Sequence, residues 1–240
     1  MLARACESRK PDGIITDPKS IEICDRIGFA TGDCVSSEYQ LAIAVRTAIV
    51  DRAMVTFLER NPGGTIVTLA AGLDTRPTRL DNGRARWVDV DLPAVIDLRS
   101  DFFPQHDRHR MISASVLDHR WMSEVHGDRP TMFLLEGLIN YLEFSATQEL
   151  VKALVLRFPS AELVMEALGL LYVRLSNRDI YKWGLCAENF PTRWEPRLEL
   201  IDSWYVYGMY GERWREFPWL SLFVLFKRDA QVVLHLRAKG

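Results

Sequence analysis

The sequence has 240 residues, 48% of them hydrophobic and 26% charged, which is the composition of a globular chain with a full core. Its 30 basic and 32 acidic residues give a net charge of −2, so it has no general attraction for nucleic-acid phosphates or anionic membranes. We expect no nucleic-acid partner and no membrane partner, and the composition leaves the oligomeric state open.

The four cysteines are far apart and include no C-x-x-C pair, and we find no secretory leader pattern. We therefore expect reduced thiols in a cytoplasmic protein. No apolar run comes near the roughly 20 residues that a membrane-spanning helix needs. The cysteines are Cys6, Cys24, Cys34 and Cys186.

The first regular element predicted is a helix over residues 38–60, where apolar side chains recur at helical spacing. The Asn-Pro-Gly-Gly stretch at 61–64 ends it. A β-branched strand over 65–69 follows and runs into the small-residue turn 70–74. This is the pattern of a strand that leads into a ligand-binding loop.

Three more strands are predicted farther along, over 86–91, 111–116 and 131–135. After the strand over 86–91, Pro93 occupies a position typical of the first residue of a helix. The strand over 131–135 is apolar throughout, as expected for a parallel strand that is covered on both faces. Ser145 and Gln148 then form a capping-box pattern ahead of an apolar helical stripe.

The rest of the chain contains a strand over 161–168, an aromatic segment over 170–196, and two closing strands over 204–210 and 232–237. The aromatic segment is a candidate cap over a ligand site. Strands that alternate with helices at this spacing indicate a doubly wound α/β sheet with right-handed crossovers.

In such a sheet, ligands bind beyond the carboxyl ends of the strands, which directs attention to four strand ends. The first carries Ala70, Ala71, Gly72 and Asp74. The small side chains there let backbone N–H groups approach a ligand, although the loop taken alone can be merely a tight turn. The G-x-G-x-x-G fingerprint of dinucleotide-binding folds is absent.

Charged residues mark two of the other strand ends and interrupt one helix. Asp89 and Asp91 lie about 20 residues past the loop, where acidic groups bind ribose hydroxyls in nucleotide-binding folds. Asp91 can instead cap the helix that starts at Pro93, and Asp89 can be an exposed edge residue. Glu136 ends an apolar strand and Arg46 interrupts an apolar helical face, so each needs a partner, which can be a ligand or a core residue.

Metal and hydrolase chemistry find little support. His106 and His109 share an H-x-x-H spacing, but no cysteine or carboxylate cluster completes a zinc set, so we interpret both as surface histidines. The chain contains no G-x-S-x-G motif, no Walker loop and no catalytic-cysteine signature. We therefore predict no metal site and no catalytic nucleophile.

Five short motifs follow one another in a fixed order. They are Val45-Arg46-Thr47, the stretch Leu69 to Arg76, the stretch Trp87 to Pro93, Ser115 to Asp118 with Trp121, and Glu136 to Leu142. Together they resemble the leucine carboxyl methyltransferase family, and most closely its bacterial branch, which includes polyketide O-methyltransferases. The resemblance extends from residues 11–13 to residues 233–237 and so covers nearly the whole chain.

The resemblance implies a Rossmann-like class I methyltransferase fold, a doubly wound, mostly parallel seven-stranded sheet with an antiparallel closing strand and a helical and aromatic cap. It also implies one S-adenosyl-L-methionine-dependent methyltransferase domain over residues 1–240. Within it we expect an N-terminal helical cap over 1–60, a cofactor-binding core over 65–168, a substrate cap over 170–203 and closing strands over 204–240.

The same resemblance suggests how the methionine part of the cofactor is held. The loop from Ala70 to Asp74 is expected to wrap it with backbone groups, and Ala70 stands where the family usually has glycine. Arg46 corresponds to the family's arginine for the cofactor carboxylate, and Glu136 to its glutamate near the amino end. These opposite charges suit a zwitterionic amino-acid tail.

The nucleoside part of the cofactor has three expected contacts. Asp91 corresponds to the family's acid for the ribose. Ser115 and Val116 fall beside the adenine, where members of the family that methylate proteins carry Asp-Leu. We predict that all three bind S-adenosyl-L-methionine.

The sulfonium of that cofactor already activates the methyl group, so the protein mainly aligns and desolvates the reactants. We expect a small-molecule acceptor, a carboxylate or hydroxyl of a polyketide-like secondary metabolite. A phenol or alcohol needs a general base, and no residue stands out as one. Tyr141, Tyr172 and Trp183 are candidates for the acceptor pocket, with core packing the alternative for each.

Two other interpretations remain open. One is methylation of the C-terminal carboxylate of a protein, and Ser115 counts against it. The other is a catalytically silent domain that binds the cofactor or a partner, and Ala70 is the one residue that favours it.

Overall fold

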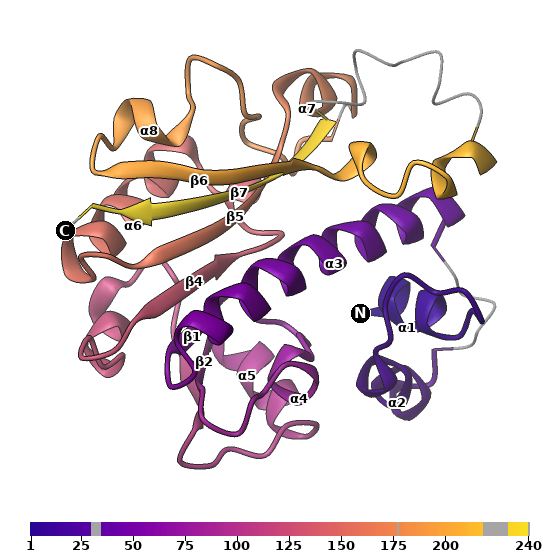
Figure 1. Ribbon diagram of the computed structural model, residues 1–240, viewed down its shortest axis with the longest axis horizontal. Helices are drawn as coiled ribbons and strands as arrows, with labels where there is room; N and C mark the ends of the chain where they lie inside the picture. Colours follow the sequence, from indigo (N-terminus) through magenta and orange to yellow (C-terminus); the bar gives the residue numbers. More distant parts are fainter. Residues whose placement is uncertain (30–34, 177, 218–229, 240) are drawn as a thin grey trace.

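The strands form one seven-stranded sheet in the computed structural model, which describes residues 1–29, 35–176, 178–217 and 230–239 (Figure 1). They are β1 (Thr65–Leu69), β2 (Arg86–Asp91), β3 (His109–Ser113), β4 (Thr131–Leu135), β5 (Glu162–Leu168), β6 (Leu198–Tyr205) and β7 (Gln231–Ala238). Their order across the sheet is β3-β2-β1-β4-β5-β7-β6. The first five in this order are parallel, and β7 runs antiparallel to β5 and β6. This confirms the predicted sheet with its antiparallel closing strand.

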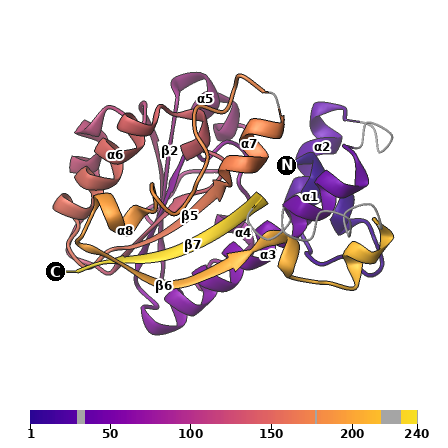
Figure 2. The same ribbon diagram turned by 90° about the horizontal axis from the view of Figure 1, so that it is seen from above.

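Helices cover both faces of this sheet. α3 (Ser37–Arg60) crosses one face and α6 (Phe144–Arg157) lies on the other (Figures 1 and 2). The helix α5 (Pro93–Ser100) begins at its proline, as predicted. The remaining helices are α1 (Leu2–Ser8), α2 (Pro18–Ile27), α4 (Arg76–Arg79), α7 (Leu170–Ser176) and α8 (Pro191–Trp194), with 3-10 turns η1 (His119–Glu124), η2 (Ile139–Tyr141), η3 (Val206–Gly208) and η4 (Arg213–Glu216).

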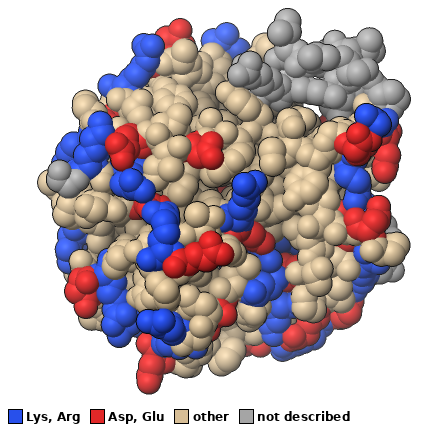
Figure 3. All heavy atoms as spheres, viewed as in Figure 1, with Lys and Arg blue, Asp and Glu red and all other residues tan. Residues whose placement is uncertain are grey.

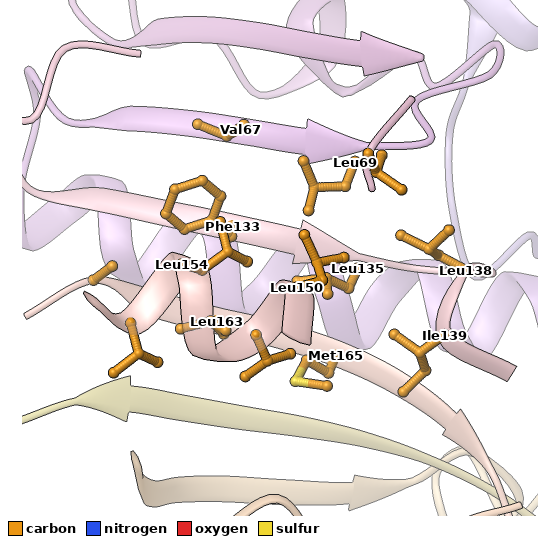
Figure 4. Packing of buried hydrophobic residues seen from close by; sticks show 14 of the residues in the cluster. Val67, Leu69, Phe133, Leu135, Leu138, Ile139, Leu150, Leu154, Leu163 and Met165 are labelled. Carbon is orange, nitrogen blue, oxygen red and sulfur yellow. The ribbon is translucent and has the colours of Figure 1, made fainter. Parts of the chain in front are cut away.

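The central strands bury side chains on both faces, because successive residues of a strand point to opposite sides. Val67 and Phe133 belong to the core on the α6 side, with Leu154 of that helix (Figure 4). Ile66 and Met132, one residue earlier in β1 and β4, pack on the α3 side. Burial on both faces explains why the sequence of these strands is continuously apolar rather than alternating.

Helix α1 lies against α3, and α2 packs on α1 (Figure 2). The Gln40 amide on α3 donates a hydrogen bond of 2.9 Å to the buried Glu7 carboxylate on α1. Asp17 begins α2 by accepting a hydrogen bond of 2.9 Å from the Ser20 N–H. The Gln40 to Glu7 hydrogen bond and the 3.1 Å ion pair of Arg4 with Asp17 hold α1 beside the carboxyl edge of the sheet, where the ligand site is expected.

Three element predictions were wrong in detail. The strand predicted over 204–210 is instead β6, which begins at Leu198 opposite Ala238 and ends at Tyr205, whose partner Val232 lies near the start of β7. The capping-box residue Ser145 lies inside α6, whose N-cap is Glu143. The strand predicted over 111–116 is shifted to β3, because its register follows β2 from Trp87 onward.

The described surface and thiols agree with a globular chain. Lysine and arginine side chains are interspersed with acidic ones on the face shown in Figure 3. Cys6, Cys24 and Cys186 form no disulfide with one another, while Cys34 lies outside the described residues. Within the described ranges, no helix is both long and apolar enough to cross a lipid bilayer.

Candidate functional site

A cavity of about 220 Å³ opens at the carboxyl edge of the sheet, where β1 and β4 end. Parallel strands place their carboxyl ends at one edge, so the loops after β1 and β4 face the same space. α3 closes one side of it and α1 another. The lining residues are Met1, Arg4, Arg46, Thr68, Ala70, Ala71, Leu73, Asp74, Glu136 and Gly137.

Arg46 and Glu136 meet in this cavity, although one comes from α3 and the other follows β4. Nη2 of Arg46 lies 2.7 Å from Oε1 of Glu136, and Nη1 lies 3.3 Å from Oε2 of Glu166 on β5. Oε2 of Glu166 also accepts a hydrogen bond of 2.6 Å from the Gly137 N–H. Glu166 therefore holds both the arginine and the loop that carries Glu136.

A second arginine, Arg76, also forms an ion pair with Glu136. Nη2 of Arg76 lies 2.7 Å from Oε2 of Glu136, and the same guanidinium contacts Asp51 at 2.6 Å and Asp74. Burial alone would raise the pKa of Glu136, but the charges of Arg46 and Arg76 outweigh it and lower this pKa to about 2. Glu136 is therefore ionised at neutral pH.

The charge pair is incompletely satisfied. Nε of Arg46 is buried and has no hydrogen-bond partner among the described residues, and the same holds for Oε2 of Glu136. The 2.7 Å ion pair of that oxygen with Arg76 lacks hydrogen-bond geometry. Leaving a buried charged donor or acceptor without a hydrogen bond is costly, so these atoms suit a ligand that supplies one carboxylate and one ammonium group.

The net charge of the cavity wall points the same way. Two of its side chains are positively charged, Arg4 and Arg46, and two are negatively charged, Asp74 and Glu136. A wall without net side-chain charge favours a zwitterion over a simple anion or cation. An amino-acid tail is such a group.

The loop after β1 is bent sharply beside the cavity. Ala70 has φ 54° and Gly72 has φ 49°, both in the left-handed region. Glycine adopts this conformation freely, whereas an alanine pays about 1 kcal/mol for it. Position 70 therefore has a backbone reason to be glycine, and Ala70 keeps the bend at a cost in stability.

Asp91 fixes this loop through its carboxylate. Oδ2 accepts a hydrogen bond of 2.7 Å from the Gly72 N–H, and Oδ1 accepts one of 2.7 Å from the Leu92 N–H. The N-cap of α5 is Leu92, so Asp91 does not cap that helix. Asp91 is buried behind the loop and does not line the cavity, and the ribose contact predicted for it stays a prediction.

Ser115 and Val116 lie farther along the same edge, after β3. The half-buried Ser115 hydroxyl accepts a hydrogen bond of 3.3 Å from the Leu117 N–H. The Val116 side chain is part of the core on the α6 side. Neither residue lines the cavity, so the structure brings five of the nine predicted cofactor residues together there: Arg46, Ala70, Ala71, Asp74 and Glu136.

His109 is buried rather than at its predicted surface position, and Asp89 is not the exposed edge residue that was one of its two alternatives. Asp89 is fully buried, with Oδ2 at 2.6 Å from both Nη2 of Arg99 and Nε2 of His109. The prediction failed because a buried Asp89 needs Arg99, which comes from α5 and cannot be placed from strand patterns alone. Across the described ranges, no cluster of histidine, cysteine or carboxylate side chains suits a metal ion.

Sequence patterns missed three charged residues of the site. Glu166 lies inside the apolar strand β5, and a carboxylate there is the one signal that could have identified it. Arg76 ends the stretch Leu69 to Arg76, and the sequence pattern indicates no partner for it. Arg4 lines the cavity from α1, where its Nη2 donates a hydrogen bond of 2.9 Å to the Leu73 carbonyl and its Nε lies 3.1 Å from Asp17.

The three candidate acceptor residues lie apart from the cavity lining. The Tyr141 ring is half-exposed and its centroid lies 5.4 Å from that of Tyr181. Tyr172 lines a separate apolar cleft of about 570 Å³ between α7, β6 and β7. Trp183 is buried, donates from its indole N–H to the Ile139 carbonyl at 2.8 Å, and packs within the core.

The sequence is similar to that of known methyltransferases. The model of the family described as leucine carboxyl methyltransferase matches residues 1–155. The tetracenomycin polyketide synthesis O-methyltransferase TcmP of Streptomyces glaucescens is 32% identical over 169 residues, which cover 70% of this chain and 63% of that protein. The S-adenosyl-L-methionine-dependent methyltransferase dpfgK of Gibberella zeae is 31% identical, over 66% of this chain and 59% of its own.

Solved structures share the fold. A protein from Thermobifida fusca, described as a methyltransferase, superposes with a TM-score of 0.63 over 99% of this chain and 94% of its own, at 16% identity. The N-methyltransferase NodS of Bradyrhizobium japonicum, bound to S-adenosyl-L-homocysteine, has a TM-score of 0.51 at 13% identity, over 79% of this chain and 87% of its own. The chain spans about three fifths of the length of the two curated relatives named above.

Proposed function

The chain belongs to the leucine carboxyl methyltransferase family, and on this basis we propose that it binds S-adenosyl-L-methionine and transfers its methyl group to an oxygen of a small molecule. The observation that carries the proposal is that Nε of Arg46 and Oε2 of Glu136 are buried beside the cavity and make no hydrogen bond among the described residues. They match the carboxylate and the ammonium of the methionine tail in number, charge and hydrogen-bonding sense.

In this proposal the residues of the chain bind and align the reactants. Nε of Arg46 donates to the carboxylate of the tail, and Oε2 of Glu136 accepts from the ammonium. When bound, the cofactor supplies a methyl group that its sulfonium has already activated. Alignment by a fixed wall can account for a large part of such a reaction's acceleration, about 7–11 kcal/mol at best.

The other predicted cofactor residues take supporting parts. Gly72, held by Asp91, presents the loop backbone to the ligand. Ser115 and Val116 contact the adenine farther along the edge of the sheet. We propose the segment 65–168 as the cofactor-binding core of a single domain, with helical cap 1–60. The substrate cap predicted over 170–203 is proposed for 170–197 only, because the closing strands begin with β6 at Leu198 rather than at 204.

The name of the Streptomyces relative supports a polyketide-like acceptor, and we propose this class over the C-terminal carboxylate of a protein. Tyr141 and Tyr172 are the proposed acceptor contacts. The same interpretation predicts a cytoplasmic enzyme that takes a small-molecule substrate and no nucleic acid.

Calorimetric titration with S-adenosyl-L-methionine and with S-adenosyl-L-homocysteine tests the proposal. We expect micromolar binding of both ligands, about 8 kcal/mol of binding free energy at a Kd of 1 μM. Absence of heat and of any thermal stabilisation at millimolar ligand would instead favour a silent domain.

A further inference from the structure

Three successive carbonyl groups in the loop after β1 are held by arginine side chains. Nη1 of Arg99 on α5 donates a hydrogen bond of 3.0 Å to the Gly72 carbonyl and one of 2.8 Å to the Asp74 carbonyl. Between them, the Leu73 carbonyl accepts a hydrogen bond of 2.9 Å from Nη2 of Arg4 on α1. Two guanidinium groups from separate helices therefore fix the loop that borders the cofactor cavity.

Arg99 is oriented toward the loop by contacts that lie away from the cavity. Its side chain is fully buried, and its Nε donates a hydrogen bond of 2.8 Å to Oδ2 of Asp89 on β2. The same oxygen lies 2.6 Å from Nε2 of His109. The guanidinium carbon of Arg99 lies 4.2 Å from the ring centroid of Phe103, which is a cation–π contact. With Nε and the ring face engaged in this way, Nη1 is directed to the loop.

The ion pair with Asp89 does not by itself account for Arg99. A buried ion pair adds little net stability over apolar side chains of similar volume. This pair also leaves Oδ1 of Asp89 and Nη2 of Arg99 without a hydrogen bond among the described residues. The Nη1 atom has two N–H groups, and it makes two hydrogen bonds to the loop. The contacts of Arg99 that are complete are therefore those to the loop.

The Gly72 carbonyl belongs to the peptide group that also carries the Leu73 N–H. The N–H groups of Ala71, Gly72 and Asp74 donate hydrogen bonds of 3.3, 2.7 and 2.9 Å to protein oxygens. Within the described ranges the Leu73 N–H makes no hydrogen bond, and Leu73 lines the cavity. The C=O and N–H of a trans peptide point in opposite directions, so Arg99 at the carbonyl turns this free N–H away from itself.

We propose that Arg99 is a positioning residue for the cofactor, because its hold on the Gly72 and Asp74 carbonyls orients the Leu73 N–H for the amino-acid tail. This inference rests on the proposed function and adds to it a residue that does not line the cavity. A loop that is already fixed loses less conformational freedom when the ligand binds, so the affinity is higher.

Lysine in place of Arg99 separates the two roles of this side chain. It keeps a positive charge opposite Asp89, so the buried carboxylate is not left without a counter-ion. A single ammonium group cannot occupy both the Nε position that faces Asp89 and the Nη1 position that faces the loop. Arg99→Lys therefore removes the grip on the loop and retains the charge.

Two ligands that differ in the amino-acid tail test the inference. S-adenosyl-L-homocysteine carries the tail, whereas 5′-methylthioadenosine has the same thioether-linked adenosine without it. Each is titrated calorimetrically into the full chain. Arg99→Lys should weaken binding of S-adenosyl-L-homocysteine by about 10–100-fold, the loss of one hydrogen bond to a charged group. It should change the affinity for 5′-methylthioadenosine less than twofold, whereas a general loss of structure would weaken both ligands alike.

Arg108→Lys is the matched control. Arg108 also joins an aspartate to a backbone carbonyl, because its Nη1 lies 2.8 Å from Oδ1 of Asp81 and donates a hydrogen bond of 3.1 Å to the Ala85 carbonyl. These partners precede β2 and so lie at the end of that strand opposite to the cavity. The affinities of Arg108→Lys for both ligands should stay within twofold of the parent values.

Phe103→Leu provides a second variant in case Arg99→Lys does not fold. It removes the ring on which the guanidinium of Arg99 lies and changes no charge. We expect it to weaken S-adenosyl-L-homocysteine by about two- to fivefold, the equivalent of one cation–π contact, and to leave 5′-methylthioadenosine unchanged.

The inference is overturned if Arg99→Lys binds S-adenosyl-L-homocysteine as tightly as the parent does, or if it weakens both ligands to the same degree. If Arg99→Lys does not fold, either of these results for Phe103→Leu overturns it. A parent chain that does not bind S-adenosyl-L-homocysteine would instead contradict the proposed function, so the two failures are distinguishable.

Discussion

Nη2 of Arg46 lies 2.7 Å from Oε1 of Glu136 at the carboxyl edge of the sheet, and each side chain keeps one buried polar atom without a hydrogen-bond partner among the described residues. Each hydrogen bond left unmade costs about 1–3 kcal/mol. The core pair Asp89 and Arg99 also leaves such atoms, but Arg46 and Glu136 differ from it because both line the cavity, where a ligand can reach them. The arrangement is explained if a ligand completes it.

Arg46→Lys should weaken binding of S-adenosyl-L-homocysteine by about 10–100-fold, because lysine keeps the charge but loses the planar fork that pairs with a carboxylate. Calorimetric titration measures the change. Arg60→Lys is the matched control, since Arg60 lies at the other end of α3 and pairs with Glu162 at 2.9 Å. Equal losses in both variants would contradict a specific role for Arg46.

Ala70→Gly should stabilise the protein by about 1 kcal/mol, because the φ of 54° at this position costs an alanine but not a glycine. Urea unfolding measures the difference. Ala71→Gly should have the opposite sign, since Ala71 has no positive φ and glycine there only adds flexibility to the unfolded chain. Destabilisation by Ala70→Gly would show that the left-handed bend is not present.

Acid should remove a stabilising contribution of Glu136. Its pKa is about 2 in the folded chain against an ordinary 4.5, so the contribution is fully present above pH 4.5 and is lost as the pH falls toward 2. Glu136→Gln should be less stable than the parent at pH 6, and this deficit should shrink as the pH falls below 4.5. Urea unfolding at several pH values checks it, and a constant deficit would exclude an ionised Glu136 as the cause.

Asp91→Asn should destabilise the protein by about 1–2 kcal/mol, because an amide offers one acceptor oxygen where the carboxylate serves two backbone N–H groups. Binding of S-adenosyl-L-homocysteine should weaken as well, since the released Gly72 no longer fixes the loop. Unfolding and titration measure the two effects. Asp97→Asn on the exposed side of α5 is the control, and an Asp91 variant that behaves like it would refute this role.

The architecture could be predicted because the patterns that define it are local. Apolar runs such as 131–135 and the proline at 93 mark parallel strands and a helix start without any knowledge of tertiary contacts. The end of β6 could not be predicted in this way, since Tyr205 is the last residue with a partner on β7. The end of a strand depends on where its neighbouring strand ends, and sequence periodicity carries no information about that neighbour.

The site also contains residues that local patterns identify and residues that only the tertiary structure brings in. Arg46 and Glu136 are conspicuous in sequence because a charge within an apolar pattern requires a partner. Glu166 and Arg76 join them only through the fold, at 3.3 Å and 2.7 Å from Arg46 and Glu136 respectively. Such contacts join segments that are distant in the chain, so no single motif could have indicated them.

The most direct test is a crystal structure of the full chain with S-adenosyl-L-homocysteine bound. The account predicts the ligand's carboxylate within about 2.7–3.2 Å of Nε of Arg46 and its amino nitrogen in the same range of Glu136. A ligand whose amino-acid tail lies elsewhere, with the Arg46 to Glu136 contact unchanged and its free atoms still unpartnered, would contradict it.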